Sequence, residues 1–444
     1  MTSSTSKAIL TPAQALARYR DALNLRLSDD RTVVLPGLIA TFFFERGSTP
    51  AVRSGILACF DRFEHLFGEH LKGGKDSDLG KFNKRTAKGV ESIRRAITET
   101  PPWQEVSVVR SSATDQDTAA EYAIATLTAT ALPEDYVSPT GMRIAKGQES
   151  GLSYLKFHVP MDLVTAAHGL AQYEEMLRVV CAQLPVRGGY GGLSPILPFS
   201  FHQYLPQEWT LAQRFSGLEI DSYAFSQSQE YDPVSYEGES MSKMDAFHAY
   251  LKPGAKVGRY GYIKGVNWYT LLGELFINRM GGERVLRTLL ARSDIAVERV
   301  GQCLLIRAGE FPRLGAPEEG LPEPYVFVNS VLRVLRNPAP DALHTYVPDL
   351  PNASAKATRV WEARFDLPDA VPLSPPPFVV PAVAESSGGR GGIMGGETCP
   401  EAGWWHTPAQ AGSRRYFSAG ETMPVIEGSQ WGTTFWQKLP DDSV

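Results

Sequence analysis

Residues 31–45, RTVVLPGLIATFFFE, are a β-rich run that ends in three consecutive phenylalanines and is long enough for one buried strand. The next segment, 50–68, carries apolar residues three and four positions apart, and Gly68 follows them as a stop signal. A buried strand followed by an amphipathic helix indicates that the fold uses both kinds of element. The apolar positions of the expected helix are Val52, Ile56, Cys59, Phe60, Phe63, Leu66 and Phe67.

Outward from this stretch, helical and extended patterns interleave without a regular β-α-β rhythm. We expect a basic helix at 81–99, and a second helix after Pro160 that Asp162 caps and that a glycine-rich turn, GGYGG at 188–192, follows. The irregular order predicts the α+β class, with a mixed or antiparallel sheet packed with several helices, or a mixed-sheet α/β fold. Two more helices are expected at 207–217 and 275–292, and extended runs at 106–110, 122–131, 154–159, 266–273 and 296–307.

The composition changes near residue 337, which predicts three parts. Residues 1–336 form the α+β domain, and residues 337–395 form a Pro/Gly-rich connection. Residues 396–444 are rich in aromatics, and five of the eight tryptophans follow residue 360. Because this many large aromatic rings need burial, we expect the C-terminal extension to form a small module docked on the main domain.

Composition and charge limit the possible functions. The chain has 444 residues, with 44 Lys and Arg against 49 Asp and Glu, which gives a net charge of −5. This mildly acidic balance argues against a general nucleic-acid binder and is compatible with a basic partner. The N-terminal residues lack the apolar core of a secretory signal, and no stretch approaches the ~18 apolar residues of a membrane span. We therefore expect a soluble protein of the bacterial cytoplasm, with its four separated cysteines as reduced thiols.

A search for catalytic motifs finds none. The zinc-binding H-E-x-x-H pair, the G-x-S-x-G nucleophile motif and the kinase signatures are missing from the sequence. The run 68–76, GEHLKGGKD, departs from a phosphate-binding loop because Asp76 stands where magnesium binding needs Ser or Thr. The eight histidines are scattered without a His or Cys at ligand spacing. The prediction is a protein with no catalytic residues, no metal and no cofactor.

An acidic, aromatic and serine-rich segment, 217–248, is the strongest functional signal. One interpretation is a solvated loop whose carboxylates keep it soluble. The other is an interface, because tyrosine offers apolar area with a hydroxyl, and carboxylates steer and pair with a basic partner such as the phosphate-binding surface of a nuclease. The candidate binding residues are Glu219, Asp221, Tyr223, Glu230, Tyr231, Asp232, Tyr236, Glu237 and Glu239.

Several other noticeable residues are predicted to be structural. Trp268 is expected to anchor the core, and Gly281-Gly282 to form a turn or a tight packing point. The basic helix at 81–99 is expected to be a solvated face. The full set of residues assigned to structural motifs is Trp268, Gly273, Gly281, Gly282, Cys399, Pro400, Trp405, Trp431 and Trp436.

The sequence resembles a family at three of these stretches, 187–197 (RGGYGGLSPIL), 214–221 (RFSGLEID) and 261–286 (GYIKGVNWYTLLGELFINRMGGERVL). They are similar to the bacterial immunity proteins of type VI secretion, and more narrowly to the type VI immunity proteins for VRR-Nuc nucleases. The tail 396–437 resembles a C-terminal module of such immunity proteins, with Cys399-Pro400, Met423-Pro424 and a final Trp-Gly…Trp.

The resemblance implies a non-enzymatic protein that binds and neutralises a co-encoded type VI effector, here a DNA-cleaving nuclease, by covering its active site or DNA-binding surface. It implies no direct contact with nucleic acid or membrane and transfers no catalytic residue. Two alternatives stay open at this stage. One is immunity against another toxin class, such as a lipase or a peptidoglycan hydrolase, and the other is a hydrolase whose site is assembled from distant residues.

Overall fold

The computed structural model describes residues 10–77, 81–131, 152–222, 262–337, 353–368, 393–407, 413–426 and 434–438, together with 340, 342–343, 370 and 409–410. The chain forms two compact units. The main unit comprises Met1–Phe276 and Leu290–Ala382, and the C-terminal unit comprises Ile277–Leu289 and Val383–Val444. The boundaries predicted at residues 337 and 396 stay predictions. Each unit is described by itself.

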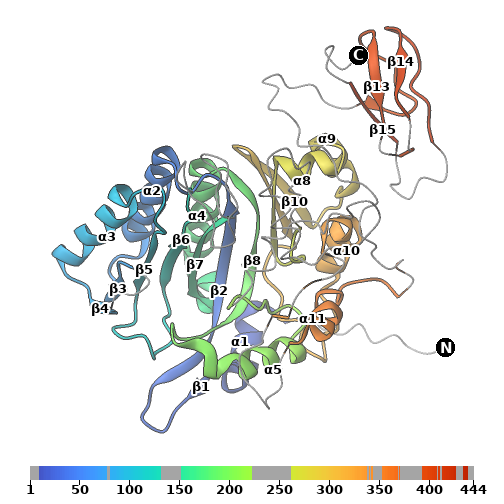
Figure 1. Ribbon diagram of the computed structural model, residues 1–444. Coiled ribbons are helices and arrows are strands. Elements are labelled where there is room, and N and C mark those ends of the chain that lie inside the picture. Colours follow the sequence, from blue (N-terminus) through green and yellow to red (C-terminus); the bar gives the residue numbers. More distant parts are fainter. Residues whose placement is uncertain are drawn as a thin grey trace, which may run out of the picture. The chain divides into compact units, whose positions relative to one another are not determined.

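An eleven-stranded sheet forms the main unit (Figure 1). Its order is β10-β11-β9-β8-β2-β7-β6-β5-β3-β4, and β1 pairs with β2 beside this path. Every strand pairing of the described residues is antiparallel, which confirms the α+β class. The strands are β1 (Leu25–Arg26), β2 (Thr32–Phe44), β3 (Gly73–Lys75), β4 (Asn83–Lys84), β5 (Ser107–Ser111), β6 (Ala123–Leu127), β7 (Ser153–Pro160), β8 (Val186–Ile196), β9 (Tyr269–Gly273), β10 (Ile295–Val300) and β11 (Cys303–Ala308).

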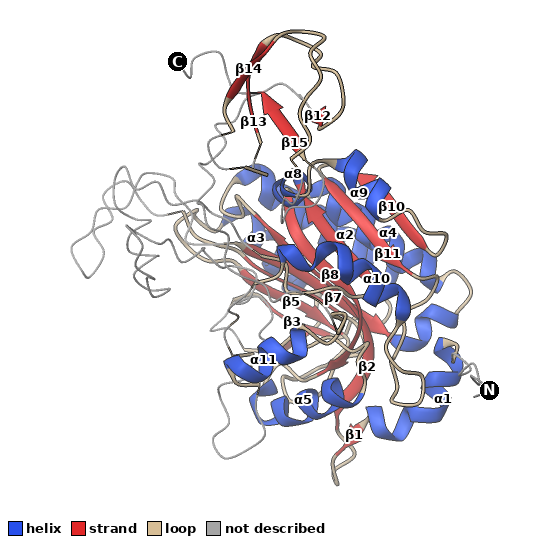
Figure 2. Ribbon diagram, turned by 90° about the vertical axis from the view of Figure 1, so that its right-hand side faces the viewer, coloured by secondary structure: helices blue, strands red, loops and turns tan. Residues whose placement is uncertain are grey.

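Figure 2 shows the helices of the described residues, of which α9 and the end of α8 belong to the C-terminal unit. They are α1 (Pro12–Leu23), α2 (Pro50–Phe67), α3 (Ala87–Glu99), α4 (Gly169–Gln183), α5 (Leu205–Arg214), α8 (Glu274–Arg279), α9 (Glu283–Leu289), α10 (Glu323–Leu332) and α11 (Ala355–Glu362), with 3₁₀ turns at Met161–Thr165, Phe201–Tyr204 and Arg333–Leu335. None of the helices in the described ranges is long and apolar enough to cross a membrane.

The run 31–45 forms β2 as predicted, and β2 pairs with β7 on one side and β8 on the other. Its successive side chains point to opposite faces of the sheet, as in any strand. On one face Phe42 lies 6.2 Å from the ring of Phe157, which in turn contacts Phe63 of α2 at 5.9 Å and Tyr173 of α4 at 5.7 Å. Helices α2 and α4 therefore cover this face with aromatic packing.

The glycine-rich stretch 188–192 is a strand and not a turn. It lies within β8, between β2 and β9. A β-carbon on Gly191 would come within 2.4 Å of the Tyr173 hydroxyl, and one on Gly192 within 2.0 Å of Asn267 Oδ1. The glycines are therefore present because other side chains approach this backbone closely, which the local pattern does not reveal.

Three further boundaries differ from the predictions. Asp162 lies in a 3₁₀ turn, and α4 begins only at Gly169, after His168 in the left-handed region at φ 67°. The stretch 275–292 is two helices, interrupted where Gly281 and Gly282 adopt φ of 86° and 97°. The stretch 296–307 falls into two strands that pair as the hairpin β10–β11.

The basic stretch 81–99 is helical only from Ala87 onward. Thr86 accepts a hydrogen bond from Gly89 N at 3.0 Å and caps α3, while Asn83 and Lys84 pair with β3 at the edge of the sheet. Lysine at a strand edge opposes pairing with another chain, so the charge of Lys84 fits this position.

The C-terminal unit contains a four-stranded sheet in the order β12-β15-β13-β14. The strands are β12 (Ile393–Met394), β13 (Gly403–His406), β14 (Arg415–Phe417) and β15 (Phe435–Lys438). Its core contains Trp405 and Trp436, which are 2% and 3% exposed, while Trp431 lies outside the described residues. The rest of this core is Ile393, Cys399, Phe417 and Met423. Cys399 and the three other cysteines are buried free thiols.

Candidate functional site

The acidic segment predicted as the contact surface lies mostly outside the described residues. Tyr223, Glu230, Tyr231, Asp232, Tyr236, Glu237 and Glu239 belong to the undescribed stretch 223–261. The structure does describe both ends of that stretch, residues 219–222 and 262–267, which we call the neck. Of the predicted contact residues, Glu219 and Asp221 lie in the neck.

Glu219 is a buried ion-pair partner and not a surface carboxylate. Its side chain is 3% exposed, and it forms an ion pair with Lys264, whose side chain is 1% exposed. Asn267 Nδ2 donates to the other carboxylate oxygen at 3.0 Å, and Lys264 Nζ also donates to the carbonyl of Ile220. These bonds join the two ends of the neck directly. A buried charge is tolerable only when it is paired and hydrogen-bonded in this way.

Asp221 lies on the sheet face that α2 and α4 do not cover. Thr41 and Tyr190 donate to its Oδ1 at 2.7 and 2.8 Å, and Lys156 Nζ donates to Oδ2 at 3.2 Å. Burial by itself would raise the pKa of Asp221, but the charge of Lys156 and the two hydroxyl donors outweigh burial and leave the pKa below its usual value. Asp221 is therefore ionised at neutral pH and held by the sheet.

Helix α5 supplies a second fully buried carboxylate beside the neck, after Glu219. Glu208 is 1% exposed and accepts from Asp221 N at 3.1 Å and from the Ser222 hydroxyl. On the same side, Lys264 Nζ lies 5.2 Å from the centre of the Tyr190 ring and 5.1 Å from that of Trp361 in α11. Trp361 packs with Trp209 of α5 in one apolar cluster, and both views show α5 beside α11 (Figures 1 and 2).

The charges of the neck balance. Arg364 lies 3.9 Å from Glu219, and burial lowers the pKa of Arg364 to about 10, so it stays charged at neutral pH. Three carboxylates and three cations therefore meet at the neck. Glu219, Asp221 and Lys264 belong to the neck itself, and Glu208, Lys156 and Arg364 contact it from other elements. Such an arrangement fixes a backbone geometry, because each charge is held by groups from different elements.

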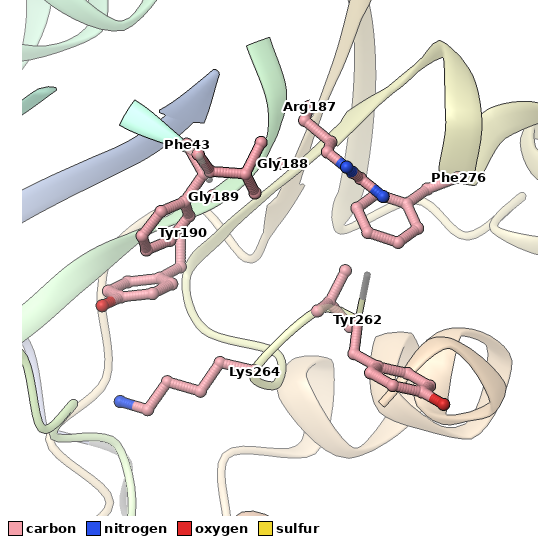
Figure 3. A pocket seen from close by; sticks show the side chains of 10 residues that line it. Phe43, Arg187, Gly188, Gly189, Tyr190, Tyr262, Lys264 and Phe276 are labelled. Carbon is pink, nitrogen blue, oxygen red and sulfur yellow. The ribbon is translucent and has the colours of Figure 1, made fainter. Parts of the chain in front are cut away.

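A small cavity opens beside the neck, between β8 and residues 262–264 (Figure 3). The rings of Phe43, Tyr190 and Phe276 surround it, while the Lys264 amine points away from it, to Glu219. Its volume is about 10 Å³, enough for about one water molecule. Small-molecule sites usually enclose roughly 300–1,000 Å³, so this cavity is no substrate or cofactor site.

Two buried thiols and one half-buried imidazole of the described residues are uncharged. Burial raises the pKa of the Cys59 and Cys181 thiols, so both are protonated and inert at neutral pH. Burial and the neighbouring Lys156 lower the pKa of His158 to about 4, and its Nε2 lies 2.9 Å from the carbonyl of Ala120. Across the described ranges, no three His, Cys, Asp or Glu side chains group as metal ligands.

Several of the residues assigned to structural motifs lie in packed positions, whereas Gly282 has open space where a β-carbon would lie and Pro400 is exposed. Trp268 is fully buried and donates from Nε1 to the carbonyl of Gly309 at 3.2 Å. A β-carbon on Gly273 in β9 would meet the carbonyl of Val186 at 2.2 Å. In the C-terminal unit Cys399 is buried, and Pro400 follows it in an exposed bend.

Sequence reasoning missed Lys264, Asn267 and Glu208 as partners of the acidic residues. A signal for two of them was present, because Lys264 and Asn267 interrupt the otherwise apolar run YIKGVNW at 262–268. A lysine within such a run is either exposed or paired, and here it is paired. Glu208 gives no such signal, since a glutamate in a helix is ordinary.

The fold and the neck define an α+β protein with an antiparallel sheet and a network of paired charges on one face of it. Comparison with protein-family models matches residues 55–234 and 249–365 to the family TsiV, type VI immunity for VRR-NUC. The chain belongs to this family, and its partner is accordingly a cognate VRR-Nuc nuclease effector.

Among solved structures, the chain is similar to the Pseudomonas aeruginosa T6SS protein PA0821. The two share 23% sequence identity with a TM-score of 0.61, over 81% of this chain and 92% of that one. This similarity supports the fold. A search of the curated proteins finds no match. The C-terminal sheet, which begins at Ile393, lies beyond the residues that the family model matches.

Proposed function

We propose that this protein neutralises its nuclease effector by occlusion, covering the active site or the DNA-binding surface without catalysis of its own. Because the effector's substrate is DNA, we place this action in the cytoplasm. The first contact is the acidic segment, within which Glu230, Asp232, Glu237 and Glu239 occur without an intervening base. A nuclease must present basic side chains to phosphate, so this stretch complements it.

The observation that supports this proposal is the neck. It holds both ends of residues 223–261 through a buried ion pair and a sheet-bound carboxylate. A segment whose ends are fixed loses less conformational entropy on binding than one attached at a single end. In this proposal Glu219 and Asp221 hold the ends of the segment and do not touch the effector. The residues that touch the effector lie between Ser222 and Tyr262.

Charge reversal of the acidic stretch tests the proposal. Replacing Glu230, Asp232, Glu237 and Glu239 with Lys changes the net charge by +8, from −5 to +3. Association with the nuclease encoded beside this gene should slow at least tenfold at low salt, and the wild-type on-rate should fall as salt rises. The measurement is surface plasmon resonance at several salt concentrations.

A matched variant controls for net charge. Glu69, Glu91, Glu99 and Glu121 are exposed, and their reversal to Lys gives the same change of +8 at other places on the surface. This control should retain most of the wild-type on-rate. Equal on-rates for the wild type and the segment variant would remove residues 230–239 from the interface.

Protection by a non-binding mechanism has a separate test. The purified protein should hydrolyse neither DNA nor the effector, and it should protect cells in proportion to complex formation. A variant that folds and binds the effector but protects no cells would establish enzymatic neutralisation instead.

A further inference from the structure

The C-terminal unit exposes an aromatic and cationic cluster on one face of its sheet. Trp404 in β13 and Tyr416 in β14 lie directly opposite each other, and their rings meet edge to face with centroids 5.7 Å apart. Arg414 places its guanidinium 5.0 Å from the centre of the Trp404 ring. Trp404 is 39% exposed and Tyr416 is 51% exposed.

The alternation of the strands explains why these rings face solvent. The neighbouring residues Trp405 and Phe417 point to the other face and form the core with Trp436. The core of this small unit is therefore complete without Trp404 and Tyr416. Two large rings held against each other at the surface cost solubility and contribute little burial, so stability alone does not explain them.

The composition of the cluster matches a binding hot spot. Tryptophan, tyrosine and arginine are the residue types most enriched among side chains that dominate protein–protein affinity. The edge-to-face contact and the stacked guanidinium restrict the three side chains before binding, which lowers the entropy that binding must remove. The four-stranded sheet that carries the cluster begins at Ile393 and lies outside the matched family region, so the match to the family does not account for it.

We propose that Trp404, Tyr416 and Arg414 form a second contact with the cognate effector, at a carboxylate-bearing surface outside its phosphate-binding groove. The proposal rests on the proposed function for the identity of the partner. Charge decides the location, because Arg414 would be repelled by the basic groove that suits residues 230–239. The surface of a nuclease outside this groove also carries carboxylates, and an arginine over a tryptophan ring complements such groups.

Two contacts on one chain make binding bivalent. Once the acidic stretch is bound, binding of the C-terminal unit to the same effector molecule is intramolecular, and an effective concentration replaces the concentration of free protein. Loss of the second contact should therefore act mainly on dissociation, whereas reversal of the acidic stretch acts mainly on association. The two kinetic effects distinguish the two sites.

The experiment uses the full chain and the neighbouring nuclease in surface plasmon resonance. Trp404→Ala/Tyr416→Ala should speed dissociation about 30-fold, in the range of hot-spot residues. Arg414→Glu, which keeps both rings, should speed it about tenfold. The control Val425→Ala removes an exposed apolar side chain of the same unit, 60% exposed, and should change dissociation less than twofold. Tryptophan fluorescence of the buried Trp405 and Trp436 reports whether the unit stays folded.

The outcomes separate this proposal from the proposed function. If both cluster variants dissociate like the wild type while the 230–239 reversal slows association, the second contact is refuted and the occlusion proposal stands. If Val425→Ala weakens binding as much as the cluster variants do, the cluster is likewise refuted as a specific contact. A wild-type chain that does not bind the nuclease refutes both proposals.

Discussion

The two faces of the eleven-stranded sheet are built from adjacent residues and differ in chemistry. On the face of α2 and α4, the packing around Phe157 is aromatic, with Phe42, Phe63 and Tyr173 around one ring. On the opposite face, Thr41 lies beside Lys156 and Tyr190 across three strands, and all three bind Asp221. The same face also carries a buried apolar cluster that includes Ile39, Phe43 and Tyr190, so the polar partners of Asp221 are set among apolar side chains.

This difference shows how one sheet serves stability and presentation at once. Apolar packing is strong and tolerates small displacements, because the hydrophobic free energy depends on the apolar area buried and not on the direction of individual contacts. A buried network of charges contributes less net stability, but it permits one geometry, since each misplaced group is left unpaired. The face of α2 and α4 therefore supports the fold by apolar packing, whereas the opposite face adds to its apolar cluster a charge network that fixes residues 219–222 and 262–267.

The largest expected effect is on the apolar face. Phe157 is 1% exposed, and Phe157→Ala leaves a cavity between α2, α4 and the sheet. The free energy of unfolding should fall by about 4 kcal/mol, measured by urea denaturation. Trp103→Ala, at a ring that is 56% exposed, is the matched control and should cost less than about 0.5 kcal/mol. A loss below about 1 kcal/mol for Phe157→Ala would mean that this face is not the main core.

The second prediction concerns the buried ion pair of the neck. Lys264→Met leaves the Glu219 carboxylate buried without its closest cation, and the unfolding free energy should fall by about 3 kcal/mol. Arg364 at 3.9 Å offers partial compensation, which keeps the loss from being larger. Adding Glu219→Gln removes the uncompensated charge, so the double variant should be more stable than Lys264→Met alone.

The same pair of variants tests the role of the neck in presentation. Lys264→Met and the double variant Lys264→Met/Glu219→Gln should both bind the effector more weakly than the wild type, since neither keeps the ion pair between residues 219 and 264. If the double variant regains stability and full affinity together, the neck is a stability element only, and the distinction between the two faces fails.

The smallest effect is a pH dependence at His158. The unfolded imidazole takes up a proton near pH 6.5, whereas the folded one stays neutral until about pH 4. The unfolded state therefore binds more protons in this window, and stability falls as the pH drops from 6.5 to 4. The difference corresponds to at most about 3 kcal/mol, and the partial exposure of the ring reduces it to about 2 kcal/mol.

Thermal or urea unfolding between pH 7 and 4 measures this slope. His158→Gln should flatten it, and His65→Gln, at an exposed position of α2, should not. Asp221 acts in a lower window, because its lowered pKa withdraws stability only as the pH falls below 3.8. An unchanged slope in His158→Gln would mean that the ring is solvated in the folded protein.

Much of the fold could be predicted from the sequence because its signals are local. The run 31–45, the helix at 50–68 and the extended runs at 106–110 and 154–159 all form where expected. In each of them the periodicity of apolar residues over a few positions already determines which face is buried. The α+β class followed from their order, and membership of the immunity family from the motifs at 187–197, 214–221 and 261–286.

The site could be predicted only in part, because burial of a charge depends on distant partners. The acidic residues at 219 and 221 looked like the start of an exposed loop, and nothing adjacent in sequence marks them as buried. Lys264 reaches Glu219 from 45 positions away, and Thr41 reaches Asp221 from 180 positions away. Glycines 188–192 were misread for the same reason, since Tyr173 and Asn267 fill the space that their missing side chains leave.

The amino-acid sequence was enough to predict the apolar elements, the class of fold and the family, because hydrophobic periodicity and motif spacing are properties of neighbouring residues. Three-dimensional contacts were needed to show that GGYGG is a central strand, that Glu219 is buried and Asp221 is held by the sheet, and that Trp404 and Tyr416 face solvent while Trp405 and Phe417 do not. These outcomes depend on which side of a sheet a residue occupies and on which distant group meets it there. Pairing and desolvation are set by three-dimensional proximity, and no local pattern carries that information.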